Sequence, residues 1–193
     1  NGQFPDAHED AFNFRAAVSY VTGSHAIKVG FNDQYGSRDI STIGNNYNLS
    51  YRFNSVTLTG GAAPNQLTEY STPNRLAENI KADLGIYAQD RWTLGRMTAN
   101  LGLRFDYFND YFPAQTLGPS LYTPNRNLSF PQTPWVAWKD FTPRMGLVYD
   151  VFGNGKTALK VSLNKYMLAY GLQGMFGDGS NPVNLTTTSV TRS

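Results

Sequence analysis

The sequence has 193 residues, of which 16 are basic and 14 acidic, for a formal net charge of +2. Such balance gives no basic surface of the kind that nucleic acids require, so nucleic acid is not an expected partner. The chain has no cysteine, which excludes disulfides and thiolate metal sites, and it has no apolar run of about 18 residues, which excludes a transmembrane helix. Only 16% of the residues are charged, against roughly 25% in soluble domains.

Three stretches alternate between apolar and polar residues, and each is interrupted once by a short turn. The first covers about residues 11–36 and turns at Gly23-Ser24, the second covers about 79–112 and turns at Leu94-Gly95-Arg96, and the third covers about 141–170 and turns at Gly153-Asn154-Gly155. A strict period of two predicts β-strands, and a glycine-containing turn between two such runs predicts a β-hairpin. The fold class is therefore all-β, with six strands in these three hairpins.

Two long segments, about 37–77 and 113–140, separate the three hairpins and are rich in Gly, Pro, Asn and Thr. All short turns thus lie at one end of the strands and all long links at the other, an asymmetry typical of transmembrane β-barrels. The link 37–77 must then contain an even number of membrane crossings. We expect none, because TLTGGAAPNQLTEYSTPN is polar on both faces; YNLSYRFNSVTL and NQLTEYSTP as an extra hairpin would give eight strands instead of six.

The polar sides of the strands carry charges of both signs at regular positions. In a membrane barrel this side lines the lumen and the apolar side meets lipid, whereas in a soluble sheet the apolar side faces the core. Runs such as 80–92 and 97–111 reach the roughly 9–11 residues that cross a membrane, beyond the soluble average of about 5–6. We therefore predict an antiparallel up-and-down meander from a transmembrane barrel. Its expected lumen-facing residues are Lys81, Asp83, Arg91, Arg104, Asp106, Arg144 and Asp150.

Glycines interspersed in the polar set are Gly30, Gly85, Gly102 and Gly146. A missing side chain in a strand lets another group approach the backbone closely. We expect loops or a plug to make that approach.

The segments GIYAQDRWTLGRMTANLGLRFDYF (85–108) and FTPRMGLVYDVFGNGKTALKVSLNKY (141–166) resemble the barrel region of TonB-dependent outer-membrane receptors, in particular the Oar-like receptors that carry a carboxypeptidase-regulatory-like domain. HAIKVGFNDQYG (25–36) resembles the strand that precedes them in that family. The resemblance implies a bacterial outer-membrane barrel of about 22 strands around a plug. It also implies uptake of a bulky ligand, such as a siderophore, glycan or peptide, driven through TonB.

With six to eight strands, no plug and no TonB box, the chain is expected to be one unit excerpted from such a barrel. Its partners would be membrane lipid, the remaining barrel and plug, and the TonB system through the parent protein. A released fragment would be extracellular.

Residues for catalysis are scarce. The sequence contains neither G-x-S-x-G nor H-E-x-x-H, and His25 falls in a tight turn. Asp83, Asp106 and Asp150 are expected in structural ion pairs, so we expect no enzyme activity, catalytic residue, cofactor or metal. The best ligand-binding candidates are the aromatic residues of the loop 113–140, which are Tyr122, Phe130, Trp135 and Trp138. Exposed on a rigid loop, they would stack on sugars or fill a partner's pocket; packing against each other or the barrel rim is the alternative.

Three other interpretations remain open at this point. An excerpt with two open sheet edges can self-associate, in the extreme as a cross-β filament. A small outer-membrane barrel enzyme would need closure by eight strands. A soluble all-β module would bind its ligand through Trp135 and Trp138.

Overall fold

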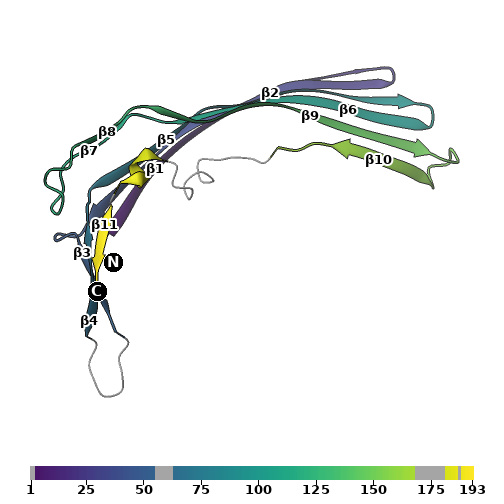
Figure 1. Cartoon of the computed structure of the whole chain (residues 1–193). Coiled ribbons are helices and arrows are strands. Elements are labelled where there is room, and N and C mark those ends of the chain that lie inside the picture. Colours follow the sequence, from purple (N-terminus) through teal and green to yellow (C-terminus); the bar gives the residue numbers. More distant parts are fainter. Residues whose placement is uncertain (1–2, 55–62, 168–180, 187) are drawn as a thin grey trace.

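The chain forms one long antiparallel sheet with smaller elements gathered at one end. The computed structural model describes residues 3–54, 63–167, 181–186 and 188–193. The sheet contains, in spatial order, β1 (Gln3–Thr22), β2 (His25–Gly44), β5 (Asn74–Leu94), β6 (Met97–Phe112), β9 (Thr133–Asp150) and β10 (Ala158–Asn164). The predicted all-β antiparallel meander of six strands is confirmed. Five of these strands are long, whereas β10 has seven residues and ends at Asn164. Figure 1 shows the sheet as an arch, with β1 and β10 at its two edges.

Short turns join the strands within each hairpin. Thr22 pairs with His25 and Leu94 with Met97, so the first two hairpins turn in two residues. Gly23 and Gly95 have φ of 53° and 57°, a backbone conformation that glycine adopts without a steric penalty at the first position of a hairpin turn. The third turn is wider, because Asp150 pairs with Ala158.

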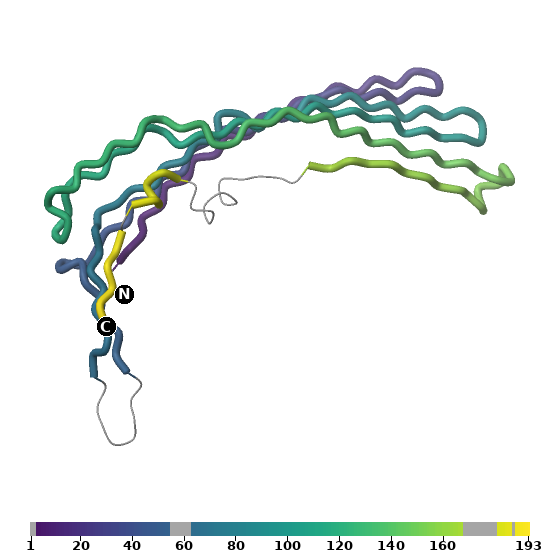
Figure 2. Tube along the Cα trace, viewed as in Figure 1, coloured from purple at the N-terminus to yellow at the C-terminus, as the bar shows by residue number. Residues whose placement is uncertain are grey.

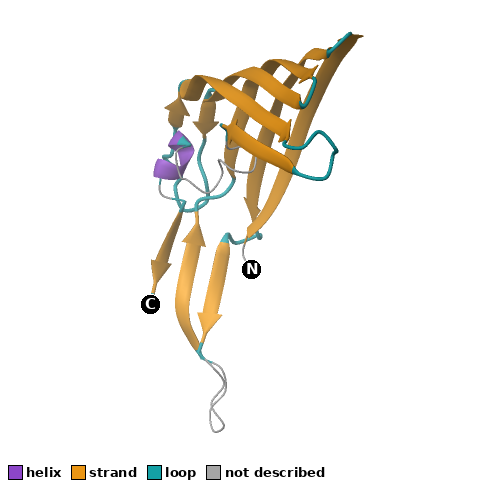
Figure 3. Cartoon of the chain, turned by 90° about the vertical axis from the view of Figure 1, so that its right-hand side faces the viewer, coloured by secondary structure: helices purple, strands orange, loops and turns teal. Residues whose placement is uncertain are grey.

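The long links contain more structure than expected. β2 pairs directly with β5, so residues 37–77 add no strand to the main sheet. However, this link contains β3 (Leu49–Phe53) and β4 (Pro64–Tyr70), which form a separate sheet with β11 (Ser189–Arg192). Figures 2 and 3 show this small sheet extending from the end of the arch opposite the short turns, hereafter the far end. The link therefore adds no strand to the main sheet, as expected, but it is more than a long loop because it contains a small sheet of its own.

The boundaries of the hairpins also differ from the expected ones at the far end. The first hairpin begins at Gln3 and its second strand ends at Gly44, rather than 11 and 36. β9 begins at Thr133, so the second link ends before residue 133 and not at 140. This link contains the short β7 (Gln115–Leu117) and β8 (Leu128–Phe130). Of the third predicted hairpin, residues 168–170 lie outside the described residues.

The sheet changes character along its length. Register shifts interrupt the pairing of β5 with β6 between Ile80 and Ala82, and of β6 with β9 between Asn109 and Tyr111. Such bulges bend a strand and change which side chains share a face. Around these shifts a small core forms, where Ile80 and Phe108 pack with Trp135, Val136 and Trp138.

The remaining elements cover the far end. The 3-10 helix η1 (Pro182–Leu185) buries Val183 completely, and Figure 1 shows it beneath the arch. Among the described residues, no helix has the length and apolar character needed to cross a membrane.

Candidate functional site: two opposed faces and the far end

Register places most of the expected lumen-facing residues on one face of the sheet, hereafter the polar face. Arg104 pairs with Tyr87, Asp106 with Gly85, and Arg144 with Gly102. Alternation along the same strands adds Asp83, Arg91 and Asp150 to this face. Lys81 differs, because it occupies the bulge between Ile80 and Ala82 and has no partner in the ladder. Alternation therefore does not determine its direction, and its predicted place on the polar face does not follow from the register.

Arg104 is the most firmly held cation of the polar face. Its Nε donates to Asp106 Oδ1 at 2.5 Å and its Nη1 donates to Asn32 Oδ1 at 2.7 Å. The Thr142 hydroxyl donates to the other Asp106 oxygen at 3.2 Å. These hydrogen bonds connect β6 with β2 and with β9, and Arg104 crosses β5 to reach β2.

Two glycines make this arrangement possible. A Cβ on Gly85 would overlap the Arg104 guanidinium, and a Cβ on Gly30 would lie 2.6 Å from the Tyr87 hydroxyl oxygen. The groups that approach these glycines are therefore side chains of neighbouring strands, not the loops or plug that we expected. The side chains of Arg104 and Tyr87 occupy the space that a Cβ on Gly85 or Gly30 would take.

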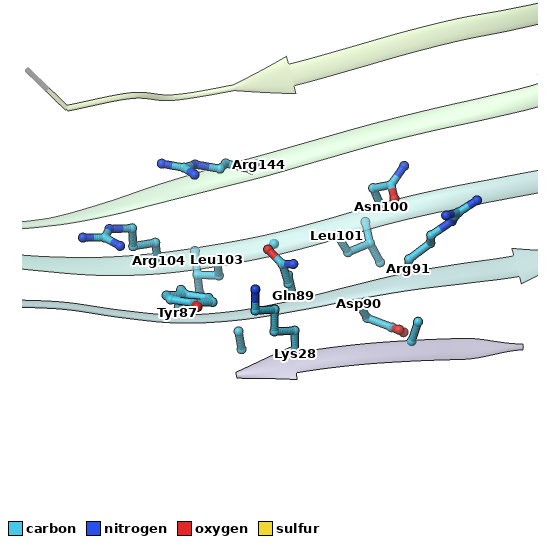
Figure 4. A pocket seen from close by; sticks show the side chains of 13 residues that line it. Lys28, Tyr87, Gln89, Asp90, Arg91, Asn100, Leu101, Leu103, Arg104 and Arg144 are labelled. Carbon is cyan, nitrogen blue, oxygen red and sulfur yellow. The ribbon is translucent and has the colours of Figure 1, made fainter. Parts of the chain in front are cut away.

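Three further cations lie near Arg104 in a shallow concavity of about 330 Å³. Figure 4 shows Lys28 and Gln89 between Arg104 and Arg144 on one side and Arg91 with Asn100 on the other. Lys28, Arg91 and Arg144 have no carboxylate partner among the described residues. Arg144 lies instead over the Tyr166 ring, at 5.0 Å from its centroid.

The predicted pairing of acidic residues with these cations is only partly present. Asp106 pairs with Arg104, but Asp150 accepts the backbone N–H groups of Gly153 and Gly155 at 3.0 and 2.8 Å. Its carboxylate is therefore occupied by the third turn. Asp90 also borders the concavity, but its Oδ2 accepts a 2.6 Å hydrogen bond from His25 Nδ1.

The opposite face, hereafter the apolar face, is exposed on every strand of the main sheet. Its large side chains include Phe12, Phe14, Val18 and Tyr20 on β1, Ile27, Val29 and Phe31 on β2, Ile86 on β5, Leu101 and Leu103 on β6, Phe141, Met145 and Leu147 on β9, and Leu159, Val161 and Leu163 on β10. An exposed apolar patch of this size marks an interaction surface. The faces also differ in coverage: Phe141 is 58% exposed, whereas the adjacent Thr142 on the polar face is 1% exposed.

Aromatic rings lie at both limits of the apolar face. Near the short turns, His25 stacks on Trp92 with ring centroids 5.5 Å apart. Toward the far end, Lys139 lies over the Tyr107 ring at 5.8 Å. From Met97 to Tyr107 the strand is about 33 Å long, which at a tilt of about 40° spans about 25 Å, the height of the apolar band of a membrane barrel.

The aromatic residues expected to bind ligand are not gathered on an exposed loop. Trp135 and Trp138 belong to β9, where their rings lie 5.6 Å from Phe112 and 4.8 Å from Phe108. Phe130 is in β8, and the Tyr122 hydroxyl donates to the Tyr47 carbonyl at 2.7 Å. The two tryptophans thus pack against phenylalanines of β6, and a role of the four aromatic residues in ligand binding stays a prediction.

Among the described residues, the far end contains three buried charged residues that sequence reasoning did not single out, which are Glu78, Asp110 and Arg126. The Arg126 guanidinium donates to the carbonyls of Gly118, Ser71 and Pro73 at 2.5, 2.5 and 2.8 Å, and burial lowers its pKa. Burial raises the pKa of Asp110 to about 7, against the opposing effect of the Tyr111 N–H. Arg126 stands as a single charge in the segment TPNRNLSF, and that isolation is the only sequence signal for its role.

Comparison with known proteins agrees with the two opposed faces. The family model of the outer membrane beta barrel domain matches residues 1–193. The chain therefore belongs to the outer membrane β-barrel domain family, and its location is the bacterial outer membrane. It is similar to the TonB-dependent transporter Oar of Myxococcus xanthus, with 26% identity over 186 residues. The match covers 86% of this chain and 16% of Oar, so the chain spans about a sixth of the length of that relative. No solved structure matches the chain.

Proposed function

We propose that this chain forms part of the wall of a TonB-dependent uptake barrel, with its polar face lining the lumen. The observation that carries the proposal is the opposition of the two faces over the same stretch of strand, one exposed and apolar, the other polar with four cations in one concavity. In barrels of this kind short turns face the periplasm and long loops face outward. The far end is then extracellular, and a bulky ligand such as a siderophore, glycan or peptide passes the polar face.

Partners follow from the same arrangement. The edges β1 and β10 are not neighbours in the sheet, so closure needs further strands, which the rest of the parent barrel supplies. Lipid covers the apolar face, and the plug and the TonB system act through the parent protein. Similarity to a protein named as a TonB-dependent transporter supports this assignment over an enzyme.

The other interpretations receive less support. A small barrel enzyme needs eight closing strands, and the main sheet has six in an open order. The outer-membrane family argues against a soluble module. The arched antiparallel sheet differs from flat stacked cross-β strands, and self-association through the open edges stays a prediction.

Cysteine accessibility in the native outer membrane tests the lumen assignment. Because the chain has no cysteine, single substitutions in it give specific signals. Gln89→Cys on the polar face is expected to react with a water-soluble maleimide, and Leu103→Cys on the apolar face is expected to stay unlabelled until detergent is added. Equal labelling of the two positions would contradict the proposal.

Energy coupling is tested by the same Gln89→Cys variant. In a TonB-driven transporter the plug must move for the lumen to open, so labelling with a bulky maleimide is expected to be faster in energised cells than in cells lacking TonB. A rate that does not depend on TonB would leave the barrel assignment intact but contradict TonB-dependent uptake.

A further inference from the structure

The concavity of the polar face has an excess of positive charge. Four cations border it, and among the described residues only Arg104 pairs with a carboxylate on that face. Lys28, Arg91 and Arg144 come from three different strands, β2, β5 and β9, so their convergence is a property of the fold and not of one basic segment. Asp90 also borders the concavity, but the four cations outnumber it. A recess whose lining carries a net positive charge concentrates anions within it.

The groups around these cations suit a hydrogen-bonding ligand. Gln89 and Asn100 line the concavity, and their side-chain amides form no hydrogen bond with another described residue. Gly102 also lines the concavity and places no side chain in it. Arg104 is held in place by Asn32 and Asp106 before any ligand arrives, so its orientation is preorganised.

We infer that this concavity binds an oxyanion group, a carboxylate or a phosphate, of a solute that passes along the wall. The inference rests on the proposed function, because it needs the polar face to line an aqueous lumen. Guanidinium groups bind carboxylate and phosphate through paired N–H donors, and Arg91 and Arg144 retain these donors. Among bulky ligands, the site therefore selects acidic ones over neutral ones.

Charge-matched thiol reagents test the inference in the full protein in its native outer membrane. Asn100→Cys places a reporter in the concavity. Its labelling rates are measured with a sulfonate-bearing and with a trimethylammonium-bearing methanethiosulfonate. Each rate is divided by the rate at which the same reagent reacts with a free thiol in solution. The anionic reagent is expected to react faster. Removing one cation about 10 Å away should lower the anion-to-cation ratio about threefold in dilute salt.

Matched variants assign the effect to the site. Lys28→Gln and Arg144→Gln, each combined with Asn100→Cys, should lower the ratio, and Lys139→Gln on the apolar face should leave it unchanged. A ratio of one or less, or one unaffected by both site substitutions, would overturn the inference. Failure of both reagents to label Asn100→Cys would instead refute the lumen assignment, and with it the proposed function.

Protection experiments then identify the oxyanion. Citrate and inorganic tripolyphosphate, added separately at millimolar concentration, are expected to slow labelling of Asn100→Cys by a neutral maleimide, and Arg144→Gln should abolish the protection. Protection by citrate alone supports a carboxylate ligand, and protection by tripolyphosphate alone supports a phosphate ligand. Protection by neither would overturn the binding site.

Discussion

Gly85 shows how a single missing side chain organises the polar face. The Arg104 guanidinium occupies the space where its Cβ would be. Gly85→Ala is expected to displace Arg104 and break its hydrogen bond to Asn32, lowering the free energy of unfolding by about 1–2 kcal/mol. Thermal unfolding in detergent measures the loss. Gly102→Ala is the control, because its Cβ would meet only ordinary contacts; an equal loss in both variants would contradict the role of Gly85.

The buried Asp110 is expected to make the stability of the far end depend on pH. Its carboxyl is 2% exposed, its Oδ2 has no hydrogen-bond partner among the described residues, and burial raises its pKa to about 7. An unfolded Asp titrates near pH 4, so between about pH 4 and 7 the folded state holds more protons and stability falls as pH rises. Below pH 4 the contribution of protonated Asp110 to the stability is fully present, and above pH 7 this contribution is lost.

Substitution of Asp110 isolates this effect. Asp110→Asn keeps an oxygen for the Tyr111 N–H but cannot ionise, so it should remove the decline between pH 4 and 7 and stabilise the far end at pH 8, by up to about 4 kcal/mol. Hydrogen exchange of β6 residues beyond Tyr107, followed from pH 5 to 8 with correction for the intrinsic rate, measures it. An unchanged pH profile in the variant would refute the assignment to Asp110.

At the scale of elements, Arg126 connects two links that are far apart in the sequence. Its guanidinium reaches carbonyls in residues 71–73 and at Gly118. Arg126→Ala leaves these acceptors without their charged donor, so we expect a local loss of about 2–4 kcal/mol and faster proteolysis of residues 118–127. Arg192→Ala is the control, since its pairing with Glu69 is exposed and worth less than about 1 kcal/mol. Equal protease sensitivity of the two variants would contradict the anchoring role.

The elements also show which parts of the fold were predictable. Alternation identified the three hairpins because one face is apolar and the other polar throughout the membrane-spanning part. Beyond it, QFPDAHED at the start of β1 has polar or charged residues at both odd and even positions, so no period of two remains to be detected. The bulge at Lys81 breaks the phase for a local reason that alternation cannot anticipate.

Proline misled the prediction for β9. Its first part contains Pro134 within a proline-rich segment, which indicated a loop. Pro143 is tolerated further along because its carbonyl accepts the Lys165 N–H, so its missing N–H faces the side where β10 has already ended at Asn164. The clustering of Lys28, Arg91 and Arg144 depends on register between strands, which the sequence of one strand does not contain.

For the whole molecule, the two opposed faces should tolerate the introduction of an arginine to different degrees. Leu103→Arg puts a charge on the apolar face, where it should cost about 2–4 kcal/mol near the middle of the membrane. Gln89→Arg adds the same group to the polar face and should cost less than about 1 kcal/mol. The amount of folded protein in outer-membrane fractions, together with unfolding in detergent or lipid, measures the difference. Equal tolerance of both substitutions would contradict the assignment of the faces.

The most direct test of the central claim is a spin-label scan of β6 from Met97 to Phe112 in the native outer membrane. Collision with oxygen reports exposure to lipid, and collision with a water-soluble nickel complex reports exposure to water. Odd-numbered positions from 97 to 107 should favour oxygen and even-numbered ones nickel, and this alternation should end beyond Tyr107. Access of nickel to odd- and even-numbered positions alike, or access of oxygen to the even-numbered positions, would contradict a wall with one lipid-facing and one lumen-facing side.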